Sequence, residues 1–164
     1  MKTRFYLLIS LVLVITFIQA QDVKLPTSKD VQKATNETTK QVTSQANLGG
    51  LVGQLTNNLS DKAFTNEFKK KKDDFTKSVS KTNNASGVSS SLQTLQGGLA
   101  PKAMDAGWGA VKGKWTKDAK TATTIKSVAG LTQTLESHIS PSVFKGDWAK
   151  TKPVWESALS SLAK

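Results

Sequence analysis

The sequence predicts an all-α protein with three helix-turn-helix repeats of 40 residues, whose six helices form a short solenoid or a bundle. Two observations lead to this prediction. One aromatic pattern occurs three times at a constant offset along the chain. Between its copies, apolar residues recur at steps of three and four, which is the periodicity of an amphipathic helix.

The first 20 residues have the layout of a secretory signal peptide. Lys2 and Arg4 precede an apolar run of 14 residues from Phe5 to Ile18, and the small residue Ala20 follows. A membrane-spanning helix needs about 18 or more apolar residues. The sequence therefore predicts cleavage after Ala20 and a periplasmic or secreted protein without a transmembrane anchor.

Residues 21–45 are polar and contain few apolar side chains, so we expect a leader that is flexible or only weakly helical. The chain has no cysteine. An exported protein of this composition must be held together by its hydrophobic core, because disulfides are excluded. We expect that core in one helical domain over residues 46–164.

The repeat is defined by three segments, FKKKKDDF (68–75), WGAVKGKW (108–115) and WAKTKPVW (148–155). Each keeps an aromatic residue, three residues, a lysine, two residues and a second aromatic residue. The register continues on both sides without a gap. This alignment divides the domain into repeats of about 47–86, 87–126 and 127–164.

Each repeat begins with one apolar stripe that predicts a first helix. A break follows it, and in the third repeat Ser140 and Pro141 at this break are typical of an N-cap and the first position of a new helix. The stripe residues are Leu48, Leu51, Val52, Leu55 and Leu59, then Val88, Leu92, Leu95 and Leu99, then Val128, Leu131, Leu135 and Ile139.

A second helix in each repeat carries an aromatic stripe, which we interpret as core. At about 100° per residue its members lie on one narrow face. Asp73, Gly113 and Pro153 occupy one repeat position and disfavour a helix interior, so we expect a kink or short break there. The predicted core aromatics are Phe64, Phe68, Phe75, Trp108, Trp115, Phe144, Trp148 and Trp155.

Lys72, Lys112 and Lys152 recur at the edge of this stripe. The simpler interpretation is that each aliphatic stem covers ring edges while the ammonium reaches water. The functional interpretation is a basic ladder that contacts a partner surface, and these three lysines are the candidate contact residues.

Catalytic and cofactor chemistry finds little support. His138 is the single histidine, and nothing recurs with it, so we interpret it as an ordinary helix-end residue. One histidine without cysteine does not supply the usual zinc ligands. Trp108 stands where a P-loop needs its first glycine, so WGAVKGKW is not a phosphate loop. We therefore expect no enzymatic activity, no metal and no cofactor.

The net charge and the type of basic residue limit the kinds of partner that the protein is expected to bind. Without Lys2 and Arg4, 21 lysines face 12 acidic residues, a net charge of +9 with no arginine. Phosphate and base recognition rely on the planar fork of arginine, so specific nucleic-acid binding is not expected.

The expected function is that of an exported protein-binding or scaffolding module. Two alternatives stay open: electrostatic binding to an anionic envelope polymer or lipid surface, and carbohydrate binding through exposed tryptophans with Asp147 or Glu156. In a eukaryotic secretory pathway Asn36, Asn58 and Asn84 would stand in glycosylation sequons.

Overall fold

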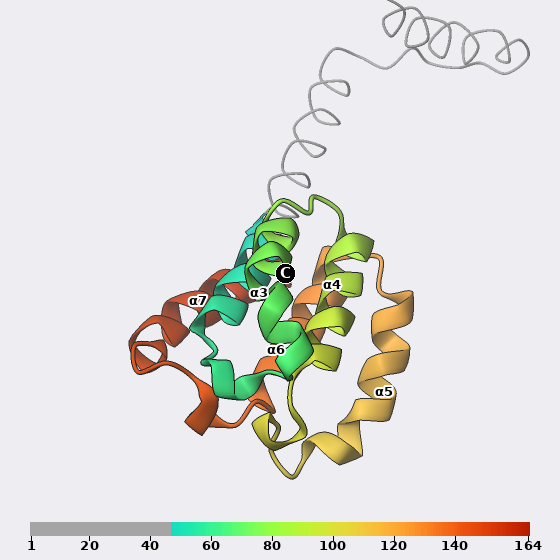
Figure 1. Cartoon of the computed structure of the whole chain (residues 1–164). Coiled ribbons are helices and arrows are strands. Elements are labelled where there is room, and N and C mark those ends of the chain that lie inside the picture. Colours follow the sequence, from blue (N-terminus) through green and yellow to red (C-terminus); the bar gives the residue numbers. More distant parts are fainter. Residues whose placement is uncertain (1–46) are drawn as a thin grey trace, which may run out of the picture. The chain divides into compact units, whose positions relative to one another are not determined.

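The apolar stripes of the sequence fold into α-helices that pack against one another. The structure is a computed structural model, and it describes residues 47–164. The predicted signal peptide (1–20), the polar leader (21–45) and the sequon at Asn36 lie outside the described residues. Within residues 47–164 the helices form an all-α bundle, which confirms the predicted fold class (Figure 1).

Six α-helices and three short 3-10 turns make up this bundle. The α-helices cover residues 47–58, α3 (Asn66–Ser80), α4 (Ala85–Gly98), α5 (Trp108–Thr121), α6 (Ile125–Ser137) and α7 (Trp148–Leu162). The 3-10 turns are η1 (Asp61–Ala63), η2 (Pro101–Ala103) and η3 (Pro141–Val143).

Side-chain caps define where several helices begin. The Thr65 hydroxyl accepts a hydrogen bond from the Phe68 amide at the start of α3. Asn84 accepts one from the Gly87 amide at the start of α4. Thr124 and Ser127 form a reciprocal capping box at the start of α6. Asn84 and Thr124 end the short linkers 81–84 and 122–124, so polar sequence between the stripes sets these helix boundaries.

The start of each second helix differs from the prediction. The serine and proline at the break initiate only a 3-10 turn, and Ser140 makes no side-chain cap there. The α-helix starts later, at Trp148 in α7. Phe144, predicted on the helix, has an extended backbone (φ −78°, ψ 154°) instead. The reason is that its backbone pairs with a different repeat.

Three single antiparallel β-bridges connect the repeats at these extended residues. The bridged pairs are Phe64–Leu99, Met104–Ile139 and Phe144–Leu59. Each residue before a 3-10 turn thus pairs with a residue that follows such a turn in a different repeat. The first two bridges connect neighbours in sequence, and the third joins the last repeat to the first.

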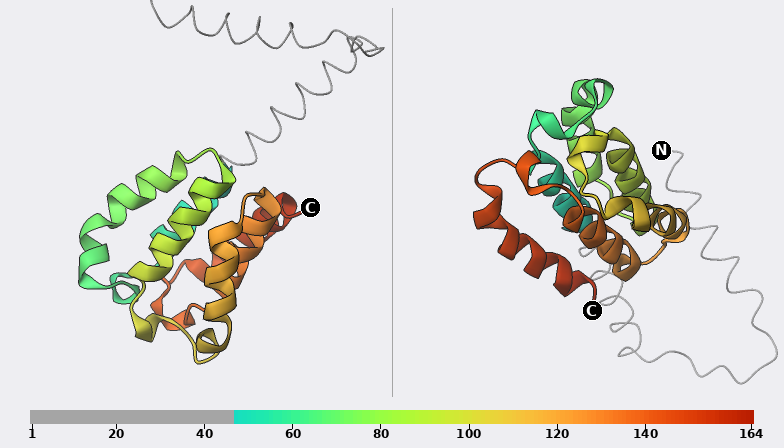
Figure 2. Two further views of the ribbon diagram at one scale, coloured as in Figure 1. Left: turned by 90° about the vertical axis from the view of Figure 1, so that its right-hand side faces the viewer. Right: turned by 90° about the horizontal axis from the view of Figure 1, so that it is seen from below.

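The third bridge settles the choice between a solenoid and a bundle. The Ser60 amide donates to the Val143 carbonyl at 2.8 Å, and the Lys145 amide donates to the Asn58 carbonyl at 2.8 Å. Farther along, the Trp155 indole donates to the Leu51 carbonyl at 2.8 Å. The first and last helices lie side by side in Figures 1 and 2. The helices therefore close into a ring instead of extending as an open stack.

The core lies mainly between the first helices of the repeats. Helix α4 packs against α3, α5 and α6, and α6 also packs against α5 and α7. The largest fully buried side chains are contributed mostly by first helices, with Val79 and Leu159 as exceptions on second helices. Close packing of branched aliphatic side chains at this centre makes every repeat dependent on its neighbours.

The structure shows no break in the helix near Asp73, Gly113 and Pro153, so the prediction of a short break there is wrong. Helices α3, α5 and α7 each run through that position without interruption. All three residues are exposed. Their unfavourable helix propensity is a local cost on the solvent side, and the aromatic stripe on the opposite side keeps the helix packed.

Ring closure makes a testable prediction about the last helix. Replacing Trp155 with Ala should lower the free energy of unfolding by about 3–5 kcal/mol, as much as Trp115→Ala in the middle of the chain. The reason is that both indoles are buried and each donates to a backbone carbonyl on the first helix of another repeat, Trp115 to Leu131 and Trp155 to Leu51. Urea denaturation followed by circular dichroism measures both losses. A clearly smaller loss for Trp155→Ala would indicate an open stack with a peripheral last helix.

A second prediction concerns adjacent glycines at the end of α4. A Cβ at Gly98 would lie 2.2 Å from Cδ2 of Phe68, whereas a Cβ at Gly97 would meet nothing within 4 Å. Gly98→Ala should therefore destabilise the protein by about 1–3 kcal/mol. Gly97→Ala should stabilise it by about 0.4–1 kcal/mol. Thermal unfolding of the two variants provides the comparison, and equal shifts would contradict the contact between Phe68 and Gly98.

Candidate functional site

The predicted core aromatics form three ladders, one along each second helix. Neighbouring ring centroids within a ladder are 5.2 Å to 5.6 Å apart. All are buried except Phe75 and Phe144, which are half-buried. The ladders are Phe64–Phe68–Phe75, Trp108–Trp115 and Phe144–Trp148–Trp155.

The tryptophans do not form an exposed platform for stacking. Each of the four indoles is only 3% to 5% exposed. Phe144 also lies parallel to Trp148, with an angle of 5° between the rings. Ring faces that are already in contact with protein cannot stack on a sugar or a base. The segment WGAVKGKW (108–115) thus places Trp108 and Trp115 inside the bundle.

Lys72 does not occupy a position suited to partner contact. Its side chain is 11% exposed, and its Nζ donates to the Leu59 carbonyl at 3.1 Å. The same ammonium lies 3.6 Å from an Asp61 carboxylate oxygen and 5.0 Å from the ring centroid of Phe64. These contacts correct the predicted surface role, because the ammonium is held at the end of the first helix.

The other two lysines of the predicted ladder differ from Lys72 and from each other. Lys112 is exposed on α5. Lys152 is half-buried, and its Nζ lies 2.9 Å from Glu136 and 3.6 Å from Glu156. The three equivalent positions therefore have three environments, and they do not make a uniform row of free cations.

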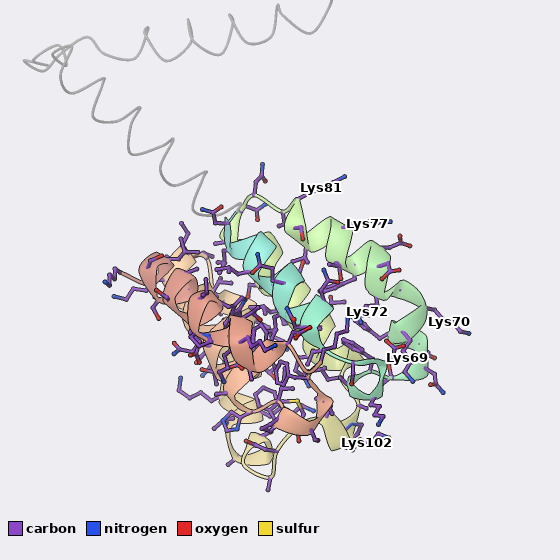
Figure 3. All side chains as sticks on the ribbon, turned by 90° about the vertical axis from the view of Figure 1, so that its left-hand side faces the viewer. Lys69, Lys70, Lys72, Lys77, Lys81 and Lys102 are labelled. Carbon is purple, nitrogen blue, oxygen red and sulfur yellow. The ribbon has the colours of Figure 1, made fainter. Side chains whose placement is uncertain are left out.

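A different set of lysines gathers on one flank of the bundle. Figure 3 shows them along α3 and on the neighbouring η2. All are exposed, and within residues 47–164 none has a carboxylate oxygen within 4.0 Å. We call this set the α3 lysine face; it consists of Lys69, Lys70, Lys77, Lys81 and Lys102. The sequence contains the Lys69–Lys72 run, but Lys102 joins the face only through the fold.

A cleft of about 510 Å³ lies in the third repeat, between the end of α6, η3 and the start of α7. Its apolar part includes Ile139, Phe144 and Trp148, and its polar part includes Glu136 and Lys152. Asp105 reaches it from the second repeat. We call this site the third-repeat cleft.

The charged pair in this cleft joins a buried carboxylate to a half-buried ammonium group. Glu136 is 2% exposed, and its carboxylate is bound by Lys152. The hydrogen bond to Glu136 is the main reason why the pKa of Lys152 is raised above its usual value. Lys152 therefore stays charged at neutral pH. A buried carboxylate is expensive to desolvate unless it is paired, so the two side chains depend on each other.

A second pair joins two repeats beside the cleft. His138 Nδ1 lies 2.9 Å and 3.1 Å from the two carboxylate oxygens of Asp105. Asp105 also accepts a hydrogen bond from the Trp108 amide at 2.9 Å. The hydrogen bond from His138 is the main reason why the pKa of Asp105 is lowered. Sequence reasoning missed this pair, because only the Met104–Ile139 bridge brings residues 105 and 138 together.

A larger hollow of about 690 Å³ lies between α5 and α6. Its lining includes Trp115 and Leu131, several threonine and serine hydroxyls, and the exposed pair of Lys114 and Asp118. The Trp115 indole already donates to the Leu131 carbonyl at 2.9 Å. The hollow thus has no buried charge and its indole is satisfied, so it offers less chemistry than the third-repeat cleft.

Residues 47–164 show neither a metal-binding cluster nor a membrane-spanning helix. That part of the chain contains no group of three or more histidine or acidic side chains placed to hold a metal ion. In the same residues no helix combines the length and the apolar character that crossing a membrane requires. Comparison of the chain with family models, curated protein sequences and solved structures gives no match.

The Asp105–His138 pair predicts a dependence of stability on acid. Because the folded state lowers the pKa of Asp105, its contribution is present above about pH 4 and is lost as the pH falls through the folded-state pKa. Asp105→Asn should therefore be less stable than the parent protein at pH 7, and this difference should shrink below about pH 4. Urea titrations at several pH values measure it.

Asp73→Asn is the control for this experiment, because Asp73 is exposed and has no ion pair among the described residues. Its difference from the parent protein should stay small throughout. A difference for Asp105→Asn that remains constant into acid would contradict the role of its charge.

Proposed function

We propose that this protein is a non-enzymatic binding module that holds an acidic protein surface by charge, through the α3 lysine face. The observation that carries the proposal is the arrangement of that face. Five exposed ammonium groups from two repeats lie along one flank, and they lack a carboxylate partner within residues 47–164. Unpaired cations on a rigid helix attract an anionic surface and accelerate its association.

The chemistry of the cations supports a carboxylate surface as the partner. The face consists of lysines alone, and after Arg4 the chain has no arginine. Lysine acts as a compact, well-hydrated point charge, whereas dedicated phosphate sites use the bidentate fork of arginine. Asp73 and Asp74 also lie on α3. The flank of α3 is thus mixed in sign, which suits a protein surface that carries carboxylates together with some cations.

The proposal extends to location and to the lack of catalysis. The first 20 residues have the pattern of an export signal, so the module would act in the periplasm or outside the cell. The single histidine is paired with Asp105, which also caps α5. A structural role for this pair accounts for both residues, and so supports a binding protein over an enzyme.

Binding to poly-L-glutamate, a carboxylate polymer, tests the proposal. The purified protein should bind it at about 20 mM NaCl and lose most of that affinity at about 300 mM, because salt screens exposed charges. The variant Lys70→Gln/Lys77→Gln/Lys81→Gln should bind about tenfold more weakly, since it removes three charges from the face. Isothermal titration calorimetry measures each affinity.

The matched control removes the same charge from α5 and α6, with Lys117→Gln, Lys120→Gln and Lys126→Gln. It should weaken binding less than about twofold. Equal losses in both variants would mean diffuse attraction by net charge, without a dedicated face. Binding to polyphosphate or to anionic vesicles, but not to poly-L-glutamate, would overturn the protein partner in favour of an anionic polymer or lipid.

A further inference from the structure

The third-repeat cleft differs from the equivalent places in the other two repeats. Glu136 is buried there and paired with Lys152, but the positions 40 and 80 residues earlier hold Gln96 and Thr56. The buried hydroxyl of Thr56 is satisfied by the Val52 carbonyl at 2.9 Å. The fold therefore accepts a neutral residue at this position, so folding alone does not explain the buried Glu136–Lys152 pair.

One residue that lines the cleft has a buried polar atom without a partner. The indole Nε1 of Trp148 is buried and makes no hydrogen bond within the described residues. By contrast, the indoles of Trp115 and Trp155 each donate to a backbone carbonyl. A buried donor left unpaired costs free energy, because it has lost its hydrogen bonds to water. A ligand oxygen that reaches this donor would recover that energy.

From these features we infer that the third-repeat cleft binds a neutral sugar ring. Its lining carries two carboxylates, Asp105 and Glu136, and two ammonium groups, Lys145 and Lys152, and Glu136 is bound to Lys152. Asp105 and Glu136 disfavour an added anion, whereas Lys145 and Lys152 disfavour an added cation. The preferred ligand is therefore uncharged.

The same lining explains why the ligand carries hydroxyl groups. The carboxylate oxygens of the lining accept hydrogen bonds, whereas its ammonium and indole groups donate them. A ligand group that satisfies both kinds of partner must be able to donate and to accept. A hydroxyl meets this requirement. The C–H face of a pyranose also matches the half-buried Phe144 and the buried Ile139 of the apolar part. The cleft volume of about 510 Å³ lies within the range of small-molecule sites.

This site is independent of the α3 lysine face. Its residues belong to η2–α5, α6 and α7, whereas the lysine face belongs to α3 and η2. It also differs from the exposed tryptophan platform that the sequence suggested, because Trp148 is buried and its ring lies parallel to that of Phe144.

Nuclear magnetic resonance tests the inference through the indole N–H signals. The four indole resonances are assigned with single Trp→Phe variants, and the purified protein is titrated with maltotriose, cellotriose and chitotriose. At least one of these neutral sugars should shift the Trp148 Nε1–H signal saturably, while the Trp115 and Trp155 signals stay in place. Triglucuronic acid and triglucosamine, which carry charge, should bind at least about tenfold more weakly.

The decisive variant is Glu136→Thr/Lys152→Met, which copies Thr56 and removes both charges so that neither is left buried alone. It should keep the helical circular dichroism spectrum and bind the sugar at least about tenfold more weakly. The matched control is Asp118→Thr/Lys114→Met, which removes the exposed pair on α5 and should bind like the parent protein. The Lys70→Gln/Lys77→Gln/Lys81→Gln variant should also bind sugar normally, which separates this inference from the proposed function.

Three results would overturn the inference. The first is an unchanged Trp148 signal with every neutral sugar up to about 10 mM, a concentration that detects even millimolar affinity. The second is undiminished sugar binding by a folded Glu136→Thr/Lys152→Met variant. The third is a saturable shift with a neutral tripeptide but with none of the sugars, which would make the cleft a peptide site.

Discussion

Backbone pairing between repeats is the constraint on which the rest of the structure depends. Each β-bridge is held by two amide hydrogen bonds, for example from Thr65 to Gly98 at 2.9 Å and from Ala100 to Ala63 at 2.8 Å. Because these bonds join one repeat to another, the helices cannot shift independently. The bridge between Leu59 and Phe144 closes the set, so no repeat has a free outer side of the kind that terminal repeats of a solenoid must cover with polar residues.

Because the bridges close the ring of helices, the three repeats can carry different residues at positions that core packing does not determine. Phe68 packs on Gly98, where a side chain would collide with its ring. The same position in the third repeat holds His138, which packs beside Trp108 at 5.8 Å between ring centroids and binds Asp105. At this repeat position the fold thus accommodates a histidine paired with Asp105 in the third repeat and a glycine in the second. Chemical features can therefore be added to a single repeat without a change of fold.

Much of the fold follows from periodicity, because a stripe at steps of three and four specifies both a helix and its buried side. The burial of Trp108 and Trp115 could be predicted in this way. The extended backbone at Phe144 could not, since the serine and proline before it signal a helix start, and only pairing with Leu59 overrides that signal. The cleft was not predictable either. Glu136 in a helical sequence resembles any solvated glutamate until Lys152 covers it.

The lysines of the bundle fall into two groups. Some ammonium groups are bound within the fold, and others are exposed without a carboxylate partner among the described residues. Lys72 is bound at the end of the first helix, and Lys152 neutralises a buried carboxylate. These two ammonium groups are committed to interactions within the fold, although the sequence repeat made them the natural candidates for partner contact. The α3 lysine face has no such commitment among the described residues. The sequence repeat therefore marked two lysines that are bound within their own repeats and one, Lys112, that is exposed. A lysine that recurs at a fixed spacing thus does not show which ammonium groups lack a carboxylate partner.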